Sequence, residues 1–211
     1  IEVDDRQISL SAATEKGMFY AIQTFFQLLP AEIESVKPLK MKLSVPAVKI
    51  ADHPRFSYRG VMIDVSRHFF TVEELKKQIS VMAMLKLNRL HLHLTDNQGW
   101  RIAIDKYPQL VEYSAVQETY NEELYGPCYY TKEDIKELVA YAGRHHIEVI
   151  PEIEFPGHSL SALVPFPELS CSGGPFKSEQ VFGYEENVFC VGNDSVFAFM
   201  ENVLTEIAEL F

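Results

Sequence analysis

A strand followed by a helix is the first element pair that the hydrophobic pattern predicts in the larger part of the chain. Residues 61–65 are apolar except for Asp64, which is typical of a buried strand. Thr71 and Glu74 then have the spacing of a capping box, in which each side chain binds the backbone of the other residue at a helix start. The predicted helix carries its apolar residues on one face: Val72, Leu75, Ile79, Met82 and Ala83.

Two more strand and helix pairs follow. Between residues 90 and 94, leucines alternate with His91 and His93 in a strict period of two, and after a long insertion Thr131 starts a helix. Residues 149–153 predict a third strand, and a third helix opens near Asp194. The apolar positions of these two helices are Ile135, Leu138, Val139 and Ala142 in the first, and Val196, Met200, Val203, Ile207 and Leu210 in the second.

Strands joined by amphipathic helices predict an α/β fold with a parallel sheet. The two candidate architectures are a doubly wound sheet and a (β/α)₈ TIM barrel. A nucleotide-binding doubly wound sheet has a Gly-rich turn after its first strand, whereas residues 66–70 read Ser-Arg-His-Phe-Phe. The barrel is therefore favoured. Because a full barrel needs roughly 250 residues, we expect these three βα units to form only part of one.

The first part of the chain follows a different pattern. Two short strands around Asp4-Asp5 precede a helix that begins after Thr14 and stops at Pro30. A polar linker follows, with prolines at positions 38, 46 and 54. We predict that residues 1–54 are the end of a small α+β domain with its linker, and that residues 55–211 form the barrel part.

The charge of the chain narrows the classes of partner. The formal net charge is −11, and the sequence has no run of Lys or Arg. Binding to nucleic acid or to an anionic membrane surface depends on neutralising phosphate charge, so neither is expected. No stretch approaches the roughly 18 apolar residues that cross a bilayer. Nothing in the sequence indicates a cofactor.

The three cysteines, Cys128, Cys171 and Cys190, are too few for a disulfide scaffold and lack the spacing of a zinc finger or ribbon. Cys171 and Cys190 flank a loop-like stretch, so they are compatible with one disulfide and equally with buried thiols. The pair His91 and His93 resembles the zinc pair of some barrel hydrolases. Packing in the barrel interior explains these two histidines at least as well, so we expect no metal.

In a barrel of this kind the active site lies at the C-terminal ends of the strands. The segments there are unusually polar: residues 64–68, 95–101 and 152–158. Together they offer cations, carboxylates, imidazoles and the single Trp, which suit a polyhydroxylated ligand. Each residue also has a structural interpretation. Asp96 could cap a turn, Arg67 could form a surface ion pair, His158 could be a turn residue, and Trp100 could lie in the core.

Three of these segments carry a resemblance to a known family. They are residues 59–70 (RGVMIDVSRHFF), residues 87–102 (LNRLHLHLTDNQGWRI) and residues 149–158 (VIPEIEFPGH). In this order they resemble the β-N-acetylhexosaminidases of glycoside hydrolase family 20. The resemblance covers essentially the whole chain, and it implies a hydrolase acting on N-acetylhexosamine-containing oligosaccharides or glycoconjugates, without a cofactor.

The resemblance also implies a mechanism. The acetamido oxygen of the substrate attacks the anomeric carbon while a Glu protonates the leaving oxygen, an exception to the two-carboxylate scheme. Arg67 matches the arginine that binds the hydroxyls on C3 and C4 of the terminal sugar. Asp96 and His158 match an Asp and a His that tune the acid. We expect pocket support from Trp100, Arg101 and Glu154.

The resemblance has two further implications. Proteins of this family are often exported, which favours a periplasmic, extracellular or lysosomal location. For an exported protein we expect Cys171 and Cys190 to be close enough for a disulfide, with Cys128 free.

One family motif is missing. The catalytic Asp-Glu pair of the family stands in a Gly-Gly-Asp-Glu segment at the fourth strand, and these 211 residues contain no such segment. We therefore expect a piece of a hydrolase that is inactive alone. We also expect it to self-associate through the exposed edge of the partial barrel. The alternative is a non-catalytic sugar-binding or structural half-barrel module.

Overall fold

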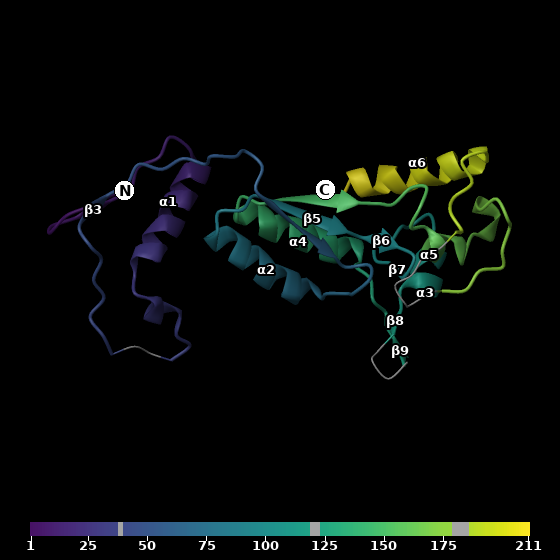
Figure 1. Cartoon of the computed structure of the whole chain (residues 1–211), viewed down its shortest axis with the longest axis horizontal. Helices are drawn as coiled ribbons and strands as arrows, with labels where there is room; N and C mark the ends of the chain where they lie inside the picture. The colour runs from purple at the N-terminus through teal and green to yellow at the C-terminus, as the bar shows by residue number, and fades with distance from the viewer. Residues whose placement is uncertain (38–39, 119–122, 179–185) are drawn as a thin grey trace.

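The computed structural model describes residues 1–37, 40–118, 123–178 and 186–211, so the linker residue Pro38 lies outside the described residues. Figure 1 shows a small N-terminal part beside a larger part that is built around a parallel sheet. The fold of the larger part is α/β. In this view helices α2 (Val72–Met84) and α4 (Lys132–Arg144) lie along the sheet, and α6 (Asp194–Ala208) lies at the upper right.

The central sheet contains β4 (Gly60–Asp64), β5 (Arg89–His93) and β10 (Glu148–Glu152), which confirms the three predicted strands to within a residue or two. Their order is β10-β5-β4, and both neighbours of β5 are parallel to it. In this register Asp64, His93 and Glu152 lie side by side. The last residues of the three strands therefore lie together at the C-terminal end of the sheet.

Helix α2 begins at the predicted capping box, and helix α4 begins directly after Thr131, as the sequence predicts. Thr71 with Glu74, and Thr131 with Asp134, each form the reciprocal pair of side-chain to backbone hydrogen bonds. The apolar faces of both helices enter one core with Leu90, Leu92 and Leu94, which are fully buried. The predicted alternation thus separates a leucine face from a histidine face on β5.

The long insertion after β5 contains short elements of its own: β6 (Thr95–Asp96), β7 (Gly99–Trp100), α3 (Gln109–Ser114), β8 (Gln117–Glu118) and β9 (Leu124–Tyr125). After β10 come α5 (Leu160–Leu163), the 3-10 helix η2 (Pro167–Leu169) and α6 (Asp194–Ala208). Helix α6 begins where the sequence predicts. Its buried Phe199 packs against Trp100, Tyr107 and Phe189, which extends the core past the strand ends.

The N-terminal part contains β1 (Glu2–Val3), β2 (Ile8–Ser9), α1 (Glu15–Leu28), the 3-10 helix η1 (Ala31–Glu34) and β3 (Val48–Lys49). Its sheet has the order β2-β1-β3, and both pairs are antiparallel. The prediction of a linker up to residue 54 was wrong in one respect. Strand β3 pairs with β1, so the chain returns to the small sheet, and two residues are too few to produce a visible alternation.

The N-terminal part meets the larger part at the N-terminal ends of the parallel strands. The hydroxyl of Tyr20 lies 2.9 Å from Nη2 of Arg59, and Gln27 donates to the carbonyl of Met84 at 3.0 Å. Lys86 reaches Asp52 at 3.0 Å. A cavity of about 830 Å³ lies at this junction, lined in part by Thr14, Lys49, Asp52, Arg59 and Lys86.

A disulfide joins Cys171 to Cys190, whose Cα atoms are 4.9 Å apart. Residues 179–185, between these two cysteines in the sequence, lie outside the described residues. Cys128 is a buried free thiol, and burial raises its pKa. Among the helices of the described residues, none combines the length and the hydrophobicity that crossing a bilayer would take.

Candidate active site

The strand ends place three ionisable side chains on one face of the sheet. Asp64, His93 and Glu152 occupy equivalent positions in the register, so their side chains point the same way. This is the face opposite the buried leucines of β5. His91 lies two residues before His93 on the same face, and its Nε2 is 2.7 Å from Oε2 of Glu152.

Arg67 reaches this face because the chain turns directly after β4. One carboxylate oxygen of Asp64 accepts hydrogen bonds from the backbone N–H groups of Ser66 (3.0 Å) and Arg67 (2.9 Å), which closes an Asx-type turn. The guanidinium of Arg67 then spans two carboxylates. Its Nη1 lies 2.6 Å from Asp64 and its Nη2 lies 2.7 Å from Asp96.

Asp96 is the buried anion of the site, with only 1% of its side chain exposed. Its Oδ2 lies near Nη2 of Arg67 and 2.8 Å from Nε2 of His93, while Oδ1 accepts the backbone N–H of Asn97 at 2.6 Å. Burial by itself would raise the pKa of this carboxyl. The hydrogen bonds from His93 and Asn97 and the charge of Arg67 outweigh burial and lower that pKa, so Asp96 is ionised.

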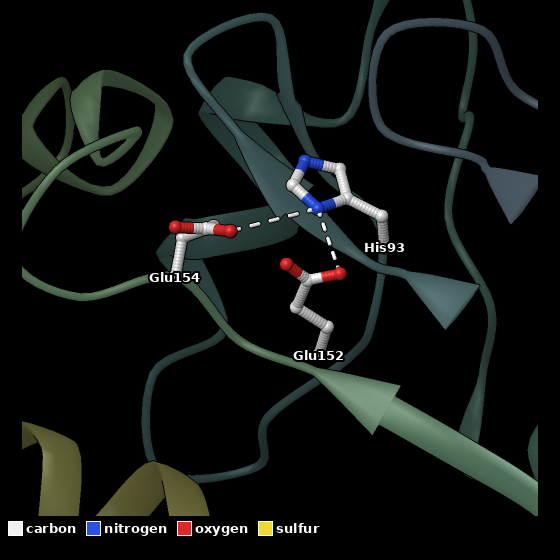
Figure 2. A group of neighbouring side chains, drawn as sticks. All are labelled: His93, Glu152 and Glu154. Atoms are coloured by element: carbon white, nitrogen blue, oxygen red, sulfur yellow. Dashed lines mark ion pairs between the residues drawn. The ribbon is translucent and has the colours of Figure 1, made fainter. Parts of the chain in front are cut away.

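His93 lies between carboxylates on two sides. Figure 2 shows its ring facing Glu152 and Glu154, at 3.1 Å and 3.6 Å from Nδ1. The opposite nitrogen contacts Asp96. Burial lowers the pKa of this imidazole, but the hydrogen bonds to Asp96 and Glu152 outweigh it and raise the pKa to about 9.

Glu152 and Glu154 lie at the end of the same strand, and each carboxyl group affects the pKa of the other. Burial and the hydrogen bond to Glu152 raise the pKa of Glu154. Burial acts on Glu152 in the same direction, but its hydrogen bonds to Glu154 and His93 lower its pKa overall. Of the two, Glu154 therefore keeps a proton more readily. Its backbone N–H donates to the Thr95 hydroxyl at 3.0 Å, which fixes it beside the second strand end.

His158 is the last of the sequence-predicted site residues that lie in this cluster. Its Nδ1 lies 3.3 Å from Oε2 of Glu154 and 3.9 Å from Oδ2 of Asp96, with about half of its side chain exposed. The backbone of His158 has a φ of 50°, a left-handed conformation that is uncommon for a residue other than glycine. Such strained positions cluster at functional sites. The structure thus brings Arg67, Asp96, Glu154 and His158 into one cluster.

Arg101 and Trp100 lie behind this cluster. Arg101 is fully buried, and its guanidinium donates to the carbonyls of Ser66 (2.7 Å), Val116 (2.9 Å) and Cys128 (3.1 Å), which holds the turn of Arg67 in place. A Cβ at Gly99 would lie 2.2 Å from Cζ of Arg101, so only glycine leaves room for it. Trp100 lies in the core: its Nε1 donates to the Ile102 carbonyl at 2.8 Å, and its ring packs on Phe199.

The ligand atoms of His93, Glu152 and Glu154 all lie within 4.8 Å of one another, which is close enough for a shared metal ion. A histidine that binds a metal needs an unprotonated ring nitrogen. Both nitrogens of His93 instead face carboxylate oxygens at hydrogen-bonding distance. The arrangement therefore fits an ion-paired network better than a metal centre.

Asp64, His93 and Glu152 were not among the sequence-predicted site residues, although they lie at its centre. A signal was available in the sequence. Each is the last residue of a predicted strand or stands next to its end, and the alternation on β5 places His93 opposite the leucine face.

Comparison with known proteins identifies the family. A family model described as "Glycosyl hydrolase family 20, catalytic domain" matches residues 56–211. A second model, "Glycosyl hydrolase family 20, domain 2", matches residues 1–53. The chain belongs to glycosyl hydrolase family 20. A β-hexosaminidase of Porphyromonas gingivalis is 46% identical over 208 residues, which are 99% of this chain and 27% of that protein. A β-hexosaminidase of Vibrio furnissii is 37% identical over 222 residues, covering 100% of this chain and 35% of the relative.

Solved structures agree with the sequence relatives. The β-N-acetylhexosaminidase of Streptomyces coelicolor A3(2) superposes with a TM-score of 0.86 at 42% identity, over 92% of this chain and 39% of that one. An exo β-N-acetylglucosaminidase of Vibrio harveyi, solved in complex with N-acetylglucosamine, superposes with a TM-score of 0.85 at 34% identity over 100% of this chain and 34% of its own. The chain spans between 27% and 39% of the length of these four proteins.

Proposed function

We propose that the protein carrying this chain removes terminal β-linked N-acetylhexosamine from oligosaccharides or glycoconjugates by substrate-assisted retaining catalysis. We further propose that the three βα units are the first three of a (β/α)₈ barrel, with a domain boundary near residue 54. The sequential order of the parallel strands and the family match from residue 56 support the barrel.

The observation that most supports the proposed function is the arrangement of Arg67 and Asp96. Two carboxylates hold the guanidinium rigidly at the strand ends, while 31% of the Arg67 side chain stays exposed. A planar fork with a permanent charge binds two adjacent hydroxyls of a sugar better than a flexible ammonium group does. A site fixed in advance also avoids the cost of ordering itself around the substrate.

Asp96, Glu154 and His158 have a supporting role in this proposal. The bond between the anomeric carbon and the leaving oxygen breaks as the acetamido oxygen of the substrate bonds to that carbon. The leaving oxygen takes a proton from a Glu that these 211 residues do not provide, since no Gly-Gly-Asp-Glu segment is present. An ionised Asp96 near such an acid raises the pKa of the acid, and His158 can share its proton.

The assay compares the intact protein with residues 1–211 alone on an aryl N-acetyl-β-glucosaminide that releases a coloured phenol. We expect turnover by the intact protein and none at a useful rate by residues 1–211. General acid catalysis typically contributes about 10² to 10⁴-fold, and the positioned acetamido group adds a further large factor. The intact protein with Asp96→Asn serves as a matched variant, because the shape is kept and the charge is lost.

Comparable turnover by both proteins would show that the catalytic machinery is misassigned. An intact protein that binds N-acetylglucosamine without hydrolysing the substrate would favour the sugar-binding module. Self-association through the sheet edge stays a prediction. Val61 and Met62 on β4 are exposed apolar residues that such an association would cover, and light scattering of residues 1–211 tests it.

A further inference from the structure

The imidazole of His93 has carboxylate oxygens at both of its ring nitrogens. Nε2 lies 2.8 Å from Oδ2 of Asp96, and Nδ1 lies 3.1 Å from Oε2 of Glu152. An ionised carboxylate can only accept hydrogen bonds, and a neutral imidazole has a single N–H to donate. Both short contacts are satisfied at once when both ring nitrogens carry a proton.

The charged and titratable groups around His93 come from all three strand ends. They are Asp64 and Arg67 at the end of β4, His91 and Asp96 on either side of His93 in the chain, and Glu152, Glu154 and His158 at the end of β10. Four of these seven groups are carboxyls, and Arg67 is the one permanent cation. Because only 6% of the His93 side chain is exposed, water screens these charges poorly.

We propose that His93 is a positioning residue of the sugar site, an imidazolium that ties Asp96 to Glu152 and thereby fixes the carboxylate against which Arg67 is held. The consequence for activity rests on the proposed hydrolase function, whereas the protonation state of His93 does not. The raised pKa of His93, about 9, agrees with the geometry.

The link from His93 to the sugar passes through a single oxygen atom. Oδ2 of Asp96 is 2.8 Å from Nε2 of His93 and 2.7 Å from Nη2 of Arg67. Two cations from different strands therefore set the direction of this carboxylate and keep it ionised. Without His93, a buried Asp96 would keep Arg67 as its close cationic partner but would bind a proton more readily.

Two substitutions of His93 test its two ring nitrogens separately. In His93→Gln the amide nitrogen can replace Nε2 and still donate to Asp96, while the donor to Glu152 and the charge are lost. In His93→Asn the shorter amide can replace Nδ1 and donate to Glu152, while the contact with Asp96 is lost. His53→Gln is the control, since His53 is an exposed residue that lines the cavity at the junction of the two parts, away from the strand ends that carry His93.

The first experiment follows the imidazole signals of the intact protein by NMR with ¹⁵N- and ¹³C-labelled histidine, assigned with these variants. We expect the His93 ring to keep both N–H protons from pH 5 to pH 8, above the ordinary histidine pKa of about 6.5. A His93 ring that loses a proton between pH 6 and 7 would overturn the proposal, whatever the variants do.

The second experiment measures kcat/KM of the intact protein and its variants against pH. Removing a cation within 3 Å of a carboxylate raises the pKa of that carboxylate, so the acid limb should move up by about 1 pH unit or more in both His93 variants. His93→Asn should lose more activity than His93→Gln, because only the latter keeps a donor to Asp96. A purely structural role would lower activity without moving the limb.

An unmoved limb in both variants would overturn the positioning role. An intact protein that is inactive but shows a doubly protonated His93 would refute the hydrolase function and leave the His93 assignment standing. If the variants fail to fold, the His93 signals of the unsubstituted protein are assigned through their backbone connectivity instead, and its NMR titration still decides the protonation state.

Discussion

The two ends of the parallel sheet bind their charged side chains in different ways. At the C-terminal end the charges pair with one another, as Arg67 does with Asp64 and Asp96. At the N-terminal end, Arg59 donates to the carbonyls of Lys86 (2.8 Å) and Phe56 (2.6 Å) and contacts the Tyr20 hydroxyl. A carbonyl does not titrate, whereas every carboxylate and imidazole does.

This difference indicates that the N-terminal end of the sheet contributes mainly to stability and the C-terminal end mainly to chemistry. The N-terminal end joins two parts of the molecule through hydrogen bonds to the Tyr20 hydroxyl and the Met84 carbonyl and through the ion pair between Lys86 and Asp52, in which no imidazole takes part. The C-terminal end concentrates groups whose protonation depends on one another, which is costly to bury and is useful where protons move. Substitutions at the two ends should therefore change different measured quantities.

The largest expected effect comes from Arg101, which lies near the C-terminal end but binds carbonyls. Replacing it by Met (Arg101→Met) leaves buried carbonyls of Ser66, Val116 and Cys128 without a donor. We expect the free energy of unfolding to fall by about 3–5 kcal/mol, measured by urea denaturation. Arg144→Met, at an exposed position at the end of α4, is the control. A loss below about 1 kcal/mol for Arg101→Met would contradict the role of this residue.

The second-largest expected effect is a loss of enzymatic activity on substitution of Arg67. Arg67→Lys keeps the charge but loses the planar fork that spans Asp64 and Asp96, and Arg67→Ala loses both. We expect kcat/KM of the intact protein on an aryl N-acetyl-β-glucosaminide to fall at least about 100-fold in Arg67→Ala, with Arg67→Lys only partly restoring it. Wild-type-like activity of Arg67→Lys would show that the fork is not needed.

Much of the fold could be predicted because its signals are local. The capping boxes at Thr71 and Thr131 and the alternation in β5 each depend on a few neighbouring residues. Strand β3 could not be predicted, because a strand of two residues has no period. Its pairing with β1 joins residues that are more than forty positions apart.

The sequence predicted several residues of the site but not the contacts between them. Arg67, Asp96 and His158 stand out as polar residues after strands, and the resemblance gives them roles. The central position of His93 depends on the register of three strands, which brings Asp64 and Glu152 to its own level. A sequence pattern shows which face a residue is on, but not how far its strand is shifted against the next.

The third effect is a dependence of stability on pH. The pKa of His93 is raised from 6.5 to about 9 in the folded protein, so its contribution is fully present below pH 6.5 and is lost as the pH rises through about 9. Over this window the difference in unfolding free energy between wild type and His93→Gln should shrink by up to about 1.4 kcal/mol per pH unit. Urea denaturation at pH 6, 7, 8 and 9 measures it. A difference that grows with pH would contradict the assignment.

The smallest effect belongs to the N-terminal end, at Lys86. Its ion pair with Asp52 is partly exposed, with 58% of the Asp52 side chain open to solvent, so Lys86→Gln should cost no more than about 1 kcal/mol. Lys86 also has a φ of 58°, which glycine adopts without strain. Lys86→Gly should therefore be at least as stable as Lys86→Gln, although the glycine also loses the side chain.

Activity is the sharper readout of these two variants, because Lys86 binds at the end of the sheet that faces away from Arg67. The carbonyl that accepts the Arg59 hydrogen bond belongs to the backbone and is kept in both variants. Their kcat/KM and their pH profile should match those of the intact wild-type protein. A shifted acid limb in Lys86→Gln would mean that the junction and the carboxylate cluster are coupled through the sheet, and the separation of stability from chemistry at its two ends would then be wrong.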